Sequence, residues 1–144
     1  MNLLIVYPMY QNRFLNFEHI LKFLSNIKSF PPLILLTIAS MLPKEWNKKL
    51  IDTNVSDLND EDILWADFVF ISAKLNQAKS ANKIIDRCKK LNAKIVASGS
   101  LFTSNDEYYK NVDHLVFDEA EITLPQFIND LSEGKAKQKY TSKT

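Results

Sequence analysis

Five short strand-like segments recur along this chain, and most are separated by segments with helical spacing. They span residues 2–7, 48–52, 67–72, 93–97 and 114–117. Most have few polar positions, which is typical of strands buried on both faces of a parallel sheet. Alternation with helices favours right-handed crossover connections and helices on both faces. The chain is therefore expected to fold as an α/β protein.

Amphipathic or apolar spacing predicts helices between these strands, over residues 14–27, 33–42, 61–65, 77–91 and 119–131. The second segment is apolar almost all round, which indicates a buried helix. It is too short for a membrane span, which needs about 20 residues. Residues 98–100 read as a turn, and the polar residues after about 135 read as a frayed tail.

These elements predict a three-layer α/β/α sandwich of the Rossmann-like, flavodoxin-like type. Its parallel sheet has five strands in the order 2-1-3-4-5, with one domain over residues 1–135 and a polar tail over 136–144. Ligands of such sheets bind beyond the carboxyl ends of the strands, at the point where strand order reverses. That crevice lies between the first and third strands, so Tyr10 and Lys74 are central to it.

The charge balance and the numbers of cysteines and histidines limit which partners and metal sites we expect for this chain. Lys plus Arg number 18 and Asp plus Glu number 17, which leaves a net charge of +1. So balanced a chain is expected to bind neither nucleic acid nor a membrane surface. Cys88 is alone and the histidines are His19 and His114, too few for a zinc or iron–sulfur site. We expect no metal site and a reducing, cytoplasmic compartment.

The sequence contains none of the common local catalytic motifs. Its one candidate catalytic residue is a lysine. There is no GxGxxG, phosphate loop, HExxH or CxxC, and Ser98-Gly99-Ser100 is only half of a nucleophile elbow. Lys74 directly follows an apolar strand near the switch point. If burial lowered its pKa, its neutral amine could form a Schiff base with a carbonyl compound. The alternative is an exposed charge on a loop.

Several short motifs resemble those of one protein family, and they occur in the same order and with similar spacing over nearly the whole chain. They are Leu3-Leu-Ile-Val-Tyr-Pro8, Pro31-Pro-Leu33 with Leu35-Leu36, Leu50-Ile-Asp52, Val96-Ala97-Ser98-Gly99 and Glu119-Ala-Glu121. Together they resemble the N-terminal cobalamin (B12)-binding domain of B12-dependent radical-SAM proteins. The resemblance implies the 2-1-3-4-5 sheet, cobalamin as cofactor, and a corrin lying over the carboxyl ends of the strands. The family's radical-SAM barrel needs a three-cysteine motif, so we expect no radical-SAM domain in this chain.

Departures from the family pattern fall on the expected ligand rim. The chain has only 2 glycines, and Ile34, Ser98 and Asp118 stand where the family usually has glycine. Glycine lets backbone approach a ligand closely. These departures suggest an engineered scaffold with a rebuilt pocket, weakened or lost cobalamin binding, and no bound cofactor. The expected pocket residues are Tyr10, Ile34, Leu75, Asn76, Ser98, Gly99, Ser100, Leu101, Phe117 and Asp118.

Three functions remain open at this point. The first is a small-molecule binding module derived from a cobalamin domain. The second is a designed amine catalyst in which Lys74 forms the Schiff base of a retro-aldol reaction. The third is an interaction domain without a small ligand, which would show as an exposed apolar patch.

Overall fold

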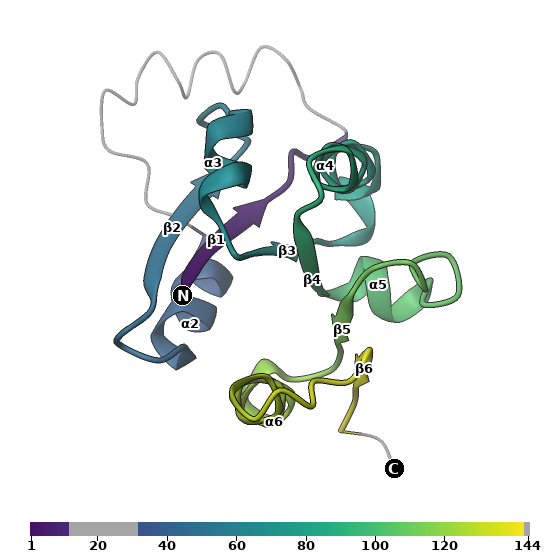
Figure 1. Cartoon of the computed structure of the whole chain (residues 1–144). Helices are drawn as coiled ribbons and strands as arrows, with labels where there is room; N and C mark the ends of the chain where they lie inside the picture. Colours follow the sequence, from purple (N-terminus) through teal and green to yellow (C-terminus); the bar gives the residue numbers. More distant parts are fainter. Residues whose placement is uncertain (12–31, 143–144) are drawn as a thin grey trace.

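The computed structural model describes residues 1–11 and 32–142 of the chain. Their strands form one parallel sheet in the order β2-β1-β3-β4-β5-β6 (Figure 1). The strands are β1 (Asn2–Tyr7), β2 (Asn47–Asp52), β3 (Phe68–Ser72), β4 (Lys94–Ser98), β5 (His114–Val116) and β6 (Lys139–Tyr140). The predicted α/β class and the order 2-1-3-4-5 are confirmed, with one further strand at the edge.

Helices cover both faces of the sheet, which confirms the three-layer sandwich (Figure 1). One face carries α2 and α6, and the other carries α3, the 3-10 turn η1, α4 and α5. The predicted helix over 14–27 lies outside the described residues. The bounds are α2 (Leu33–Met41), α3 (Asp60–Trp65), η1 (Leu75–Gln77), α4 (Ala78–Lys90), α5 (Ser100–Ser104) and α6 (Ala120–Ser132).

Alternation along the central strands divides the core between the two faces. In β1, Leu3 and Ile5 pack on the side of α2 and α6, whereas Leu4 and Val6 pack on the side of α3 and α4. All four side chains are buried. Successive residues of a strand point to opposite faces, so a strand that is apolar throughout must be covered twice. This explains the continuous apolar runs that predict the fold. Cys88 is likewise buried in the α4-side core, as a small apolar residue.

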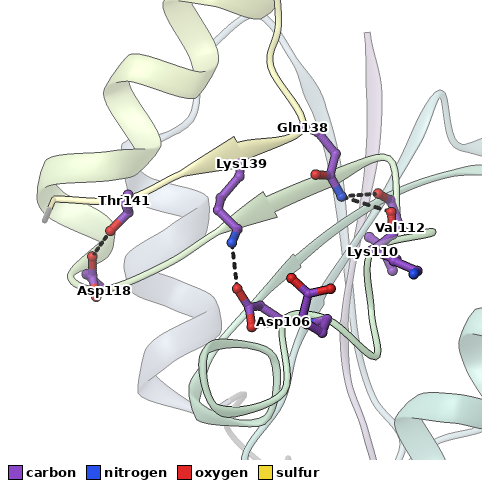
Figure 2. Close-up of polar contacts among 8 residues, drawn as sticks. Asp106, Lys110, Val112, Asp118, Gln138, Lys139 and Thr141 are labelled. Carbon is purple, nitrogen blue, oxygen red and sulfur yellow. Dashed lines mark hydrogen bonds and ion pairs between the residues drawn. The ribbon is translucent and has the colours of Figure 1, made fainter. Parts of the chain in front are cut away.

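The sixth strand comes from the segment predicted to be a frayed polar tail. The backbone N–H groups of Leu115 and Phe117 donate to the carbonyls of Gln138 and Tyr140, at 2.7 and 2.9 Å. The Tyr140 ring is buried. Figure 2 shows three side chains that tie the same segment down: Gln138 reaches the carbonyls of residues 110 and 112, Lys139 reaches Asp106, and Thr141 reaches Asp118. The five-strand prediction is therefore one strand short.

Two helix predictions need correction. In α2 only Leu35 and Ile38 are buried, whereas Leu33, Ile34 and Leu36 are exposed. A helix lying on one face of a sheet buries one stripe, so an apolar sequence does not ensure burial all round. The predicted turn after β4 is the short helix α5. Within the described residues, no helix is long and apolar enough to cross a membrane.

Candidate functional site: the carboxyl rim of the sheet

The loops that follow the parallel strands all emerge at one edge of the sheet, here called the carboxyl rim. It comprises residues 8–11 after β1, 53–58 after β2, 73–77 after β3, 99–100 after β4, 117–119 after β5 and 141–142 after β6. Each connecting helix runs back toward the amino edge, so its first turn also belongs to the rim. Ligands of open α/β sheets bind at this edge.

The loops after β1 and β3 are joined at the switch point by hydrogen bonds. Gln77 is fully buried. Its side-chain amide donates to the carbonyl of Pro8 at 2.5 Å, and its side-chain oxygen accepts the backbone N–H of Lys74 at 2.7 Å. The backbone N–H of Gln11 also donates to the carbonyl of Asn76, at 2.8 Å. A buried amide satisfied in this way holds both loops in one conformation.

Asn54 joins the loops after β1 and β2. Its side-chain oxygen accepts the backbone N–H of Tyr10 at 3.1 Å, and its amide donates to the carbonyl of Pro8 at 3.2 Å and to Asp52 at 2.7 Å. The loop after β1 is therefore held from both neighbouring strands. The sequence alone does not indicate the bridging role of either Asn54 or Gln77. The only signal for Gln77 was a polar residue at the start of an amphipathic helix.

The expected polar pocket residues lie in different surroundings. Lys74, Asn76 and Ser100 are exposed at the rim. Lys74 therefore lacks the burial that the amine hypothesis requires. The buried Ser98 accepts the backbone N–H of Ala73 through its own carbonyl, at 3.0 Å.

Asp118 is bound by the chain segment that follows β6. Its carboxylate accepts the Thr141 hydroxyl at 2.7 Å and both the backbone N–H and the hydroxyl of Ser142, at 2.9 and 3.0 Å (Figure 2 draws the Thr141 contact). Its backbone φ is +62°, a conformation in which aspartate is better tolerated than most residues. Asp118 thus fixes the turn after β5.

The expected apolar pocket residues divide into core and surface. Leu101 and Phe117 are buried in the core on the α4 side. Ile34 and Leu75 are exposed at the rim, Leu75 by 55%. Gly99 has φ +106°, and a Cβ built on it would lie 2.3 Å from the carbonyl oxygen of Ala73. This glycine permits a close approach within the chain itself.

Exposed apolar side chains gather at the carboxyl rim. Among residues 1–11 and 32–142, seven of the ten large hydrophobic residues that are exposed lie in its loops or in the first turns of α2 and α6: Met9, Leu33, Ile34, Leu36, Val55, Leu75 and Ile122. The other three, Met1, Leu64 and Tyr108, lie elsewhere. Exposed apolar side chains at a ligand-binding edge can contact the apolar part of a ligand.

A cleft of about 410 Å³, with a lining of both polar and apolar side chains, opens at the rim between the loop after β1, residues 53–59 and α4. Its lining includes Ser80, Lys83 and Arg87, so it can accept a polar part of a ligand. Among the described residues, no three of His, Cys, Asp or Glu come together as metal ligands. His114 lies at the other end of the sheet, where its Nδ1 contacts the carbonyl of Lys137 at 2.6 Å.

Two natural proteins are similar to this chain over nearly its whole length. An uncharacterized methyltransferase of Synechocystis sp. is 37% identical over 138 residues, which are 94% of this chain and 26% of the relative. A hopanoid C-2 methylase of Rhodopseudomonas palustris is 30% identical over 138 residues, which are 95% of this chain and 26% of the relative. The chain therefore spans about a quarter of the length of these relatives.

No protein-family model matches the chain, and no solved structure matches it. The chain is thus similar to one portion of methyltransferases. Neither relative supports the hypothesis of an engineered scaffold.

Proposed function

We propose that this chain is a cobalamin-binding domain of a methyltransferase-type protein, with the corrin lying on the carboxyl rim. Similarity to a methyltransferase and a methylase over almost the full chain supports this assignment. The observation that carries it is the apolar rim, since seven of the ten large hydrophobic residues that are exposed in the described part of the chain lie there. The motifs that resemble B12-binding domains include the rim segments after β4 and β5.

The chemical character of the rim residues matches that of a corrin. A corrin presents a broad, largely apolar face with amide side chains around its edge. Leu33, Ile34 and Leu75 offer apolar surface of the matching type. Ile34, which replaces the family's glycine, adds to this surface. The space that Gly99 leaves open is taken by the carbonyl of Ala73, so glycine there serves the fold itself.

When bound, cobalamin supplies a cobalt atom that can carry a methyl group. The chain's own residues would hold its face with apolar side chains and its amide edge with polar groups such as Lys74 and Asn76. Within the described residues, the ring of His114 packs near Phe68 and Phe127, away from the rim. We therefore propose that this chain would hold the corrin by one face and by its edge, and that His114 would not be a cobalt ligand.

Titration with hydroxocobalamin tests the proposal. The visible spectrum and equilibrium dialysis report binding, and circular dichroism confirms that the sample is folded. We expect saturable one-to-one binding at micromolar concentration or below, and the same affinity for His114→Ala. A folded chain that binds no hydroxocobalamin would contradict the proposed function.

A further inference from the structure

Two tyrosine hydroxyls meet at the carboxyl end of β1. The oxygens of Tyr7 and Tyr10 lie 2.6 Å apart, and their rings meet edge to face with centroids 5.8 Å apart. Tyr7 is buried, with 3% of its surface exposed, whereas Tyr10 is half-buried in the rim loop. Both belong to the core on the side of α2, the helix whose first turn exposes apolar side chains at the rim.

One hydroxyl proton of the pair is not used in the hydrogen bond between the two tyrosines. Two hydroxyls bring two protons, and one of these lies between the two oxygens. Within residues 1–11 and 32–142, neither hydroxyl makes a second hydrogen bond. If Tyr10 donated to Tyr7, the remaining proton would be buried without an acceptor, which is costly. Tyr7 therefore donates to Tyr10, and the proton of Tyr10 is left at the rim.

This remaining donor is held in place and stays protonated. The backbone N–H of Tyr10 donates to Asn54, so the loop cannot swing freely. Burial is the largest cause that raises the pKa of Tyr10 to about 12. Lys74 and Asp52 both act electrostatically on Tyr10, with opposite signs. Because these charges oppose each other, the position suits a neutral acceptor better than an ion.

We infer that the Tyr10 hydroxyl, whose oxygen accepts the hydrogen bond of buried Tyr7, donates its own proton to an amide carbonyl oxygen at the edge of the corrin. This inference rests on the proposed function and adds to it a specific ligand group. Corrin side chains end in primary amides, whose oxygens are neutral acceptors. A second oxygen source on the same ligand is the phosphate of the nucleotide tail.

The experiment compares the wild-type chain with Tyr10→Phe and Tyr7→Phe, using hydroxocobalamin and hydroxocobinamide, which lacks the nucleotide. Tyr10→Phe removes the donor, whereas Tyr7→Phe leaves the Tyr10 proton available. We expect Tyr10→Phe to weaken binding of both ligands about 3- to 10-fold, the value of one neutral hydrogen bond. Tyr7→Phe should stay within about twofold of wild type. Thermal melts show that each variant is folded.

The outcomes separate this inference from the proposed function. Absence of binding by the wild-type chain would overturn both. Binding by the wild-type chain, with equal affinity for Tyr10→Phe, would overturn only the inference. Equal losses in both variants would show a structural role for the pair and also overturn it. A loss with hydroxocobalamin but not with hydroxocobinamide would place the acceptor on the phosphate and overturn the amide assignment.

Discussion

At the scale of single residues, Gly99 shows what the scarcity of glycine means. Of the two glycines, Gly99 lies at the rim with φ +106°, and its missing Cβ makes room for the carbonyl of Ala73. That carbonyl accepts the backbone N–H of Leu101 at 3.2 Å. Gly99 therefore lets α5 begin directly against the loop after β3, and the interpretation of rim glycines as space for a ligand does not apply here.

Gly99→Ala should destabilise the chain strongly. A positive φ costs a non-glycine residue about 1–3 kcal/mol, and the new Cβ would also overlap the Ala73 oxygen at 2.3 Å. Gly134→Ala is the matched control, because its φ is +69° but nothing lies within 4 Å of the added atom. In urea unfolding, Gly99→Ala should lose at least about 2 kcal/mol more than Gly134→Ala. Equal losses would show that the contact with Ala73 relaxes without cost.

At the scale of elements, β6 shows how a polar segment becomes part of the sheet. Its two residues bury one tyrosine ring against Phe127, at a centroid distance of 5.5 Å. The Tyr140 hydroxyl donates to Asp130 at 3.0 Å and accepts the backbone N–H of Lys137 at 2.7 Å. Neighbouring Lys139 forms an ion pair with Asp106, and both side chains are substantially exposed. The buried ring therefore anchors this edge, and the ion pair contributes less.

Tyr140→Ala should cost about 3–4 kcal/mol of unfolding free energy, as removal of a buried aromatic ring does. Lys139→Ala should cost less than about 1 kcal/mol, the usual range for an exposed ion pair. Tyr140→Phe should fall between them, because it keeps the ring and loses two hydrogen bonds. Urea unfolding of the three variants gives this ranking. If Lys139→Ala lost more unfolding free energy than Tyr140→Ala, the ion pair and not the buried ring would be the main anchor of this sheet edge.

The strands and crossovers could be predicted because their signals are local. Residues 68–71, for example, are apolar at every position, which implies cover on both faces of the sheet. β6 could not be predicted, because two polar-flanked residues pair only when β5 offers an edge. The apolar segment 33–42 suggested full burial, but burial depends on which stripe faces the sheet. The spacing of apolar residues thus predicts helices and strands better than it predicts what each side chain packs against.

The same limit applies to the site. The carboxyl rim follows from parallel topology, so the sequence could place Tyr10, Ile34 and Leu75 there. It could not assign the bridging roles of Asn54 and Gln77, because those bonds join loops far apart in the chain. Nor could it separate exposed Leu75 from buried Leu101, since both follow strands with similar apolar character.

At the scale of the whole molecule, exposed apolar surface is unevenly distributed. Among the described residues, the carboxyl rim holds seven of the ten large hydrophobic side chains that are exposed. Leu64, 64% exposed, is an exception near the amino edge: the carbonyl of its neighbour Trp65 accepts the side chain of Asn2, at the start of β1, at 3.1 Å. Leu64 is thus as exposed as the rim leucines but lies away from the rim. It therefore serves as a matched control for substitutions of those leucines.

Leu33→Ser and Leu75→Ser should each weaken hydroxocobalamin binding about 5- to 10-fold, because a bound corrin would bury part of each leucine. Their unfolding free energies should change little, since these side chains are 78% and 55% exposed. Leu64→Ser should bind as the wild type does. Equilibrium dialysis measures the affinities, and urea unfolding measures the stabilities. If the rim variants bind as tightly as Leu64→Ser, the corrin does not lie on this surface, and the apolar rim serves another partner.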